Sequence, residues 1–392
     1  MAKRKHELDT RILTVFFLAA MPFVAVGSFI VVNMARSELR DSVGLSLEQR
    51  AIQSKLGIER YVADQVVHLR LVATDPQVVT TLSRQSPAPP PEELRRMEQA
   101  WASGQDARLL GSLLESPVAA RLRQVVRLRP ALKYIQVVGA QGMVLASAAR
   151  TGRLHHAESA WFKALSAEEA LREPWVGDIQ RAASVGTLLE IAYPVRDEDG
   201  HWLGAVRGLL DGADLYAVLA PVRIGRTGHA VLVRATDGMI LASDESERIL
   251  QSPLPGWASL QSALEGHPLA EQGQALFGRS QQQRGYWTIP EVTGRAGEGK
   301  PAFAEPSRLV GYAPVDQVPN VKWLVAVEQD TAEALAPVDG VTRYLWMHFI
   351  GVFATVILLA LYFSFKMDTP VMEEELHLHE EHVPASMRHT EG

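Results

Sequence analysis

Three aromatic side chains in the middle of the chain could form the wall of a binding pocket. They are Trp161, Phe162 and Trp175. Small-molecule pockets combine apolar walls with a few polar groups that orient the ligand, so an aromatic cluster of this kind is a candidate. The same residues could equally be ordinary hydrophobic core, and the sequence pattern leaves both interpretations open.

Charged residues follow the aromatic ones at spacings that a β-strand could use. Arg207 and Asp211 alternate with apolar residues in GAVRGLLDG, so a strand would present both on one face. On a pocket face they could bind the two ends of a zwitterion, whereas on a solvent face they would form an exposed pair of small energetic value. Asp178 and Arg181 are weaker candidates. The predicted ligand-binding residues are Trp161, Phe162, Trp175, Asp178, Arg207 and Asp211.

Other chemistry has little support in the sequence. His155 and His156 are adjacent, and adjacent histidines rarely converge on one metal ion. The segment 373–382, EEELHLHEEH, holds three histidines that could bind zinc or nickel, but a solvated acidic tail has the same composition. The chain contains no cysteine, which excludes disulfides and thiolate sites, and its net charge of −6 gives no general attraction to nucleic acid. No phosphate-binding loop or GxSxG motif is present, so we expect no metal, no cofactor and no enzyme activity.

Two apolar segments indicate a membrane protein. Residues 12–34 and 344–365 are each long enough to span a bilayer as a helix. A cleaved signal peptide is the alternative for the first, but its apolar run is longer than such peptides need. Basic residues at 3–5 and 11 predict a cytoplasmic N-terminus (1–11), and two spans return the tail (366–392) to the cytoplasm. Residues 35–343 would then lie outside the cytoplasm.

The outer region begins with helices and continues with strands. Apolar residues recur at helical spacing from 36 to about 79, with Gly44 and Gly57 making one continuous helix uncertain. Helical spacing returns over 92–128, and Gly104 and Pro117 are expected to break it into pieces. We therefore assign 35–130 to a long stalk helix and a helical region.

A repeated motif follows these helices. GMVLAS at 142–147 recurs as GMILAS at 238–243, each in a predicted hairpin, and a second hairpin follows each copy, over 188–211 and 307–330. The order of hairpin, insert, hairpin thus occurs twice. This predicts two tandem α+β modules with antiparallel sheets, at 131–220 and 221–338.

These segments resemble the double Cache (dCache) family of extracytoplasmic sensor domains in bacterial signalling proteins. The stretches that carry the likeness are 58–78, SAWFKAL at 159–165, GRTGHAVLVRATDGMILAS at 225–243, and 321–338. The resemblance implies two PAS-like modules attached to a long helix and a small-molecule pocket in the membrane-distal module, 131–220. Trp161 and Phe162 match the aromatic pair of the amino-acid-binding group, but Ser159 stands where that group has an arginine.

The resemblance also suggests a function and partners. We expect a two-pass sensor in the bacterial inner membrane that binds a metabolite, such as an amino acid or another carboxylate, and forms a homodimer. No kinase, cyclase or methyl-accepting segment follows residue 365, so we expect the signal to pass to a separate partner such as a kinase or cyclase. The alternative is a non-signalling protein that binds a solute or assembles a membrane complex.

Overall fold

The computed structural model describes most of the chain. The described residues are 2–150, 152–167, 173–182, 186–258, 260–261, 285–289, 292–293, 304–305 and 307–367. The predicted acidic tail and its histidines lie outside them. The chain divides into two compact units, Arg40–Ala334 and the paired ends Met1–Leu39 with Leu335–Gly392, and each unit is described separately below.

The paired ends contain the two apolar helical segments. Helix α1 (Ala2–Ala73) begins in this unit, and helix α9 (Thr331–Met367) ends in it. In the described residues, each contains a stretch long and apolar enough to cross a membrane, in the regions where the sequence predicts spans. An ion pair of 2.6 Å between Arg36 and Asp339 joins the two helices within the unit.

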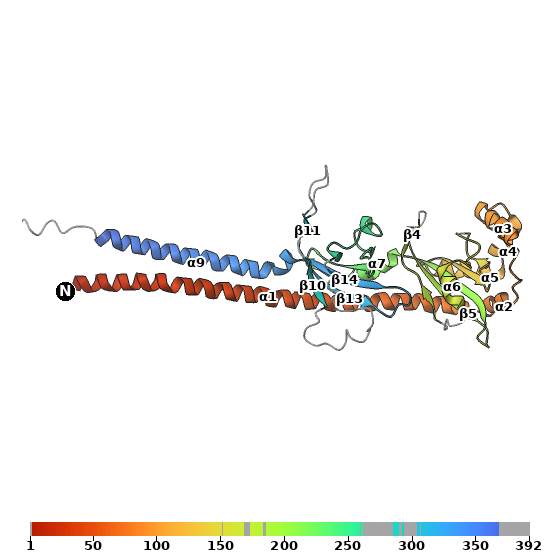
Figure 1. Ribbon diagram of the computed structural model, residues 1–392, viewed down its shortest axis with the longest axis horizontal. Helices are drawn as coiled ribbons and strands as arrows, with labels where there is room; N and C mark the ends of the chain where they lie inside the picture. The colour runs from red at the N-terminus through yellow and green to blue at the C-terminus, as the bar shows by residue number, and fades with distance from the viewer. Residues whose placement is uncertain are drawn as a thin grey trace, which may run out of the picture. The chain divides into compact units, whose positions relative to one another are not determined.

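Helix α1 continues into the larger unit and is not interrupted at either glycine (Figure 1). A Cβ atom at Gly44 would overlap the ring of Tyr286, and one at Gly57 would lie 2.8 Å from Val218 Cγ1. Both glycines therefore allow close approach of the helix to its neighbours. The helix ends at Ala73, earlier than the predicted residue 79, because Pro76 disfavours helical geometry in the preceding residue, which caps the next helix.

Four short helices follow α1 (Figure 1). They are α2 (Pro76–Ser83), α3 (Pro91–Ser103), α4 (Ala107–Leu114) and α5 (Pro117–Leu128). Gly104 ends α3 in the left-handed conformation (φ 72°) that glycine adopts without strain. Pro117 begins α5 after a Ser116 cap, so both predicted breaks are confirmed.

Two antiparallel sheets confirm the predicted tandem repeat. The first sheet has the order β2-β1-β6-β5-β3, with β4 paired to β5, and the second has the order β10-β13-β14-β8-β7, with β9 paired to β8. The strands of the first module are β1 (Leu132–Gly139), β2 (Val144–Ser147), β3 (Trp175–Val176), β4 (Gln180–Ala182), β5 (Gly186–Arg196) and β6 (Trp202–Asp211). Those of the second module are β7 (Arg223–Ile224), β8 (Gly228–Arg234), β9 (Ile240–Ala242), β10 (Tyr286–Ile289), β13 (Arg308–Val315) and β14 (Trp323–Asp330).

The repeated motifs occupy equivalent places in the two sheets. The similar sequences at 142–147 and 238–243 include β2 and β9, each the outer strand of a hairpin with β1 or β8. The later hairpins are β5–β6 and β13–β14. Shorter elements complete the described fold: helices α6 (Ala160–Ser166) and α7 (Ala213–Leu219), the 3-10 turn Ser246–Arg248, and the paired strands β11 (Val292–Thr293) and β12 (Ala304–Glu305).

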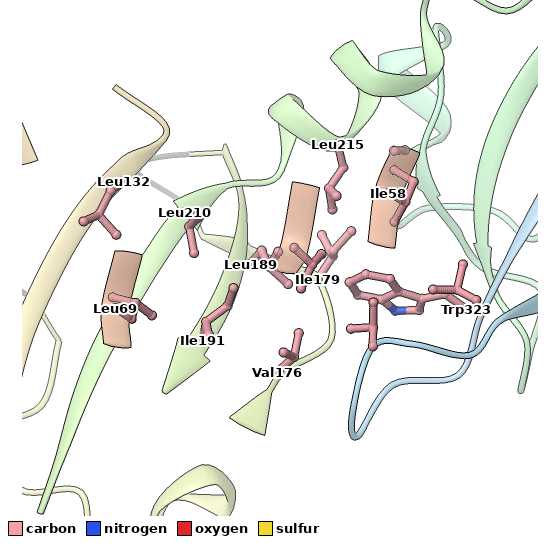
Figure 2. Packing of buried hydrophobic residues seen from close by; sticks show 14 of the residues in the cluster. Ile58, Leu69, Leu132, Val176, Ile179, Leu189, Ile191, Leu210, Leu215 and Trp323 are labelled. Carbon is pink, nitrogen blue, oxygen red and sulfur yellow. The ribbon is translucent and has the colours of Figure 1, made fainter. Parts of the chain in front are cut away.

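One face of each sheet packs against α1. Leu69 of α1 lies against Gly208 of β6, and the backbone at Leu47 and Glu48 lies against Gly311 of β13. Figure 2 shows Ile58 and Leu69 of the helix within the same hydrophobic cluster as strand residues of both modules. The face of the first sheet that points away from α1 is therefore left for other contacts, and there the candidate site lies.

Candidate functional site

A cavity of about 940 Å³ lies against the first sheet, on the face opposite α1. Side chains of a strand alternate between its two faces, so Val206 and Leu210 of β6 enter the core beside α1, whereas Arg207 and Leu209 line the cavity. The cavity is lined by Lys133, Tyr134, Arg150, Gly152, Arg153, His156, Ser159, Ala160, Trp161, Trp175, Val176, Gly177, Asp178, Gln180, Ala182, Leu188, Glu190, Arg207, Leu209 and Asn320.

The three predicted aromatic residues divide between the cavity and the core. Trp161 and Trp175 line the cavity, while Phe162 is not among the lining residues and packs edge-on between Trp161 and Trp202, with ring centroids 5.5 and 5.8 Å away. Trp161 is only 2% exposed, so its indole belongs to the hydrophobic core and also forms part of the cavity wall. Both interpretations of the aromatic cluster thus apply to part of it.

Arg207 and Asp211 occupy different surroundings although they share a strand. Arg207 lines the cavity and pairs with Glu190 of the neighbouring strand β5, another lining residue. Asp211, at the end of β6, pairs with Lys133 at 3.2 Å and accepts a hydrogen bond from the backbone of Ala213 at 2.9 Å. Among the described residues, the cavity lining includes the arginine and not the aspartate.

Asp178 lines the cavity, but its carboxylate already has partners. One oxygen pairs with Arg234 of β8, and the other accepts hydrogen bonds from Trp323 Nε1 at 2.9 Å and from the backbone of Ile179 at 3.0 Å. Arg181, three residues further on in β4, donates to the carbonyl of Ile249 at 2.5 Å and is not a lining residue. Both side chains of this segment therefore contact the second module.

A buried chain of hydrogen bonds runs from the first sheet to the start of α6. Tyr134 donates to Gln136 Oε1 at 2.8 Å, and the Gln136 amide nitrogen lies 2.9 Å from His156 Nε2. An amide nitrogen only donates, so this imidazole nitrogen accepts, and the proton must sit on Nδ1. His156 Nδ1 lies 3.3 Å from Ser159 Oγ, which leaves the serine proton free for another acceptor.

The electrostatics of the site keep this imidazole neutral. Burial, and secondly the positive charge of Arg207, lower the pKa of His156 from 6.5 to about 3. The imidazole is therefore neutral at physiological pH. Together with Ser159 it offers a hydrogen-bonding wall without a charge.

The cavity lining carries more positive than negative charge. Four of its side chains are cationic, Lys133, Arg150, Arg153 and Arg207, and two are anionic, Asp178 and Glu190. Arg150 donates to the carbonyls of Trp101 and Ala102 at the end of α3, at 2.9 and 2.6 Å. Arg153 is exposed and has no ion-pair partner among the described residues. The arrangement favours an anionic group in the cavity.

Sequence reasoning missed several of these residues. Tyr134 sits on a strand, LKYIQVVG, in which all residues but Lys133 are buried, so no alternation marks its cavity-facing side chains. Arg150 and Arg153 lie outside helices and strands, where no periodicity applies. The sequence suggests only a metal-binding role for His155 and His156. The structure gives them separate partners, since His155 Nε2 lies 3.0 Å from the Gln141 carbonyl oxygen and His156 joins the chain above.

Comparisons with known proteins point to one family. The family model of the Cache domain, dCache_1, matches residues 34–338. No curated protein matches the sequence. Among solved structures, the chain is similar to the ligand-binding domain of the Pseudomonas fluorescens chemoreceptor CtaA in complex with L-isoleucine, at 16% identity and TM-score 0.44, covering 77% of this chain and 98% of that one.

Two Pseudomonas aeruginosa PAO1 amino acid chemoreceptors give similar values. The ligand-binding domain of PctB, in complex with L-Arg, is 16% identical with TM-score 0.43, and the match covers 75% of this chain and 97% of that one. The domain of PctC, in complex with GABA, is 19% identical with TM-score 0.43, and the match covers 74% of this chain and 100% of that one.

Proposed function

The chain belongs to the Cache domain family, and from this premise we propose that it is an extracytoplasmic sensor whose first module binds a small molecule carrying a carboxylate. The binding site is the cavity against the first sheet, with Trp161 and Trp175 as its apolar walls. Of the other residues predicted from the sequence, Arg207 contacts the ligand. Asp178 forms the cavity floor, the part of the lining that is bonded to Arg234 and Trp323. Phe162 and Asp211 lie outside the lining and support it.

The observation that carries this proposal is the unbalanced charge of the lining. Glu190 neutralises Arg207, and Asp178 is neutralised by Arg234 from outside the cavity. Asp211 neutralises Lys133, so Arg150 and Arg153 are the lining cations without a carboxylate partner among the described residues. Arg150 already donates to the carbonyls of Trp101 and Ala102. Arg153 therefore has the freer guanidinium, a group that binds a carboxylate through two parallel hydrogen bonds. Arg153 thus supplies the positive charge that the family's arginine would give at the position of Ser159.

A ligand amino group could also be accommodated. Glu190 lies on the cavity side of β5 and supplies carboxylate oxygens, and Ser159 offers the proton that its contact with His156 leaves free. These two groups and Arg153 would orient a zwitterion or a hydroxy acid. The proposal therefore covers α-amino acids and other small carboxylates.

Signalling requires that the ligand prefer one of two conformations. A ligand shifts an equilibrium only by its differential affinity, typically about 1–3 kcal/mol of coupling. Helix α1 packs on both modules and is continuous with an apolar segment, so it is the element through which a change in the first module would be transmitted. The homodimer, the separate signalling partner and the absence of enzyme activity stay predictions from the sequence.

A thermal-shift screen tests the proposed function. The detergent-solubilised full chain is melted with amino acids, dicarboxylates, polyamines and purines, each in excess. A compound at 100 times its dissociation constant adds about 2.7 kcal/mol to the free energy of unfolding, a rise of several degrees. We expect stabilisation by carboxylates and none by polyamines.

Variants matched in charge localise the effect. Arg153→Gln removes the lining arginine proposed to bind the carboxylate and should abolish the shift, whereas Arg127→Gln removes an exposed cation on α5 outside the cavity and should leave it intact. Trp161→Ala is a poor probe, because the buried indole belongs to the core and its loss costs about 3–5 kcal/mol. Stabilisation by polyamines alone, or equal shifts in the two arginine variants, would contradict the proposal.

A further inference from the structure

One residue of the cavity lining comes from the other module. Asn320 lies in the turn between β13 and β14, residues 316–322, which belongs to the second sheet. Its backbone has a φ of 66°, a left-handed conformation that asparagine adopts more readily than most residues. The side chain is exposed, and its amide has no hydrogen-bond partner among the described residues.

The start of this turn is clamped to α1. Lys55 Nζ lies 2.6 Å from Asp316 Oδ1, and Glu59 Oε1 accepts hydrogen bonds from the backbone nitrogens of Asp316 and Gln317, both at 3.0 Å. The side chains of Lys55 and Glu59 are only 9% and 7% exposed. Separating these buried charges would leave each without a partner in a poorly solvated place, which is energetically costly, so the contacts stay formed.

The end of the turn is fixed to the cavity floor. Trp323, 1% exposed, donates from its indole nitrogen to Asp178, which also pairs with Arg234. Figure 2 shows the Trp323 ring beside Ile179, in the cluster that also contains Val176 of β3. Asn320 therefore stands between two fixed points and faces a cavity built by the first module.

We propose that Asn320 is a ligand-contacting residue, so that the second module closes one side of the first module's binding cavity. The inference rests on the function proposed above and adds a residue to its site. An amide offers both a donor and an acceptor, and it suits the polar part of a small carboxylate or amino acid. A ligand bound by Asn320 would shift the position of the turn. The contacts of Asp316 and Gln317 with Lys55 and Glu59 would pass that shift to α1.

The absence of cysteine from the chain makes the proposal testable by thiol labelling. Asn320→Cys introduces a single thiol in the full detergent-solubilised chain. Gln317→Cys is the matched control, because Gln317 is exposed in the same turn and does not line the cavity. Two methanethiosulfonates serve as probes, one carrying an ethylsulfonate and one an ethyltrimethylammonium group, with each rate divided by that of a free small thiol.

The expected result is a charge preference confined to the cavity position. At residue 320 the anionic reagent should react at least about threefold faster than the cationic one, relative to the same ratio at residue 317. Any compound that stabilises the wild-type chain should slow labelling at 320 and not at 317. Equal ratios at the two positions, with no protection, would overturn the proposal.

A second variant controls for the backbone strain that cysteine could introduce at the positive φ of residue 320. Asn320→Gly keeps that backbone conformation and removes the amide, so it should weaken binding of the stabilising compound several-fold without lowering the melting temperature of the free chain. Stabilisation of the wild type with unchanged affinity in Asn320→Gly refutes the role of Asn320 and leaves the proposed function standing. If no compound stabilises the wild type, the proposed function fails, and the charge preference at 320 alone decides whether the residue faces the basic cavity.

Discussion

Acid should destabilise the chain through His156, the neutral histidine of the cavity wall. Its pKa is lowered to about 3 by burial and by Arg207, against 6.5 when unfolded. Between those pH values the unfolded chain binds more protons, so the free energy of unfolding falls as the pH falls. The loss from this one group is about 2 kcal/mol between pH 8 and pH 5, and about 5 kcal/mol below pH 3.

The assay compares urea unfolding of the wild type with that of His156→Gln at several pH values from 8 to 5. Glutamine retains an oxygen that can accept from the Gln136 amide and has no proton to gain in this range. Other titrating groups are common to both proteins and cancel in the difference between them. The stability advantage of the wild type should therefore shrink by about 2 kcal/mol over this interval. If the stability difference between the two proteins stays constant or grows, His156 is charged in the folded chain. Its Nε2 could then not accept a hydrogen bond from Gln136, and the neutral imidazole assigned above would be wrong.

Two further predictions concern the second module. The hydrogen bond to Glu328, at 3.1 Å, raises the pKa of His229 to about 9. Protonated His229 therefore adds about 3 kcal/mol to the free energy of unfolding. This contribution is fully present below pH 6.5 and is lost as the pH rises through 9. Unfolding of wild type and His229→Gln should converge over that interval, and parallel curves would argue against the ion pair. Gly311→Ala places a methyl group into the α1 backbone at Glu48 and should cost about 1–3 kcal/mol. Gly340→Ala on α9 meets no atom and, because alanine favours a helix over glycine, should leave the melting temperature unchanged or raise it slightly in calorimetry. Equal melting temperatures for these two alanine variants would contradict the close packing of α1.

The repeated hairpins were predictable because they depend on local sequence. Alternating apolar residues and turn glycines define β1–β2 and β8–β9, and the breaks at Gly104 and Pro117 follow from backbone chemistry. The predicted end of α1 is too late, because the apolar pattern continues through the cap before Pro76. Local capping outweighed periodicity there.

The site was predictable only in part, because much of it is assembled from distant segments. Trp161, Trp175 and Arg207 stand on regular elements beside strong patterns, and all three line the cavity. Arg153 lies in an irregular loop, and Asn320 arrives from the other module, so no spacing in the sequence connects them to the cavity. Contacts of this kind depend on how the two sheets pack along α1.

The central claim is that a small carboxylate occupies the cavity against the first sheet, and calorimetric titration of the best stabilising compound tests it most directly. Ala160→Trp places an indole in the cavity at the first residue of α6, and Ala107→Trp places the same group at the exposed first residue of α4. We predict one binding site in the wild type and in Ala107→Trp, with affinity at least about tenfold lower in Ala160→Trp, because the added indole takes the space beside Ser159 and Trp161, where the ligand is proposed to bind. Equal affinity in all three proteins would place the ligand elsewhere and contradict the account.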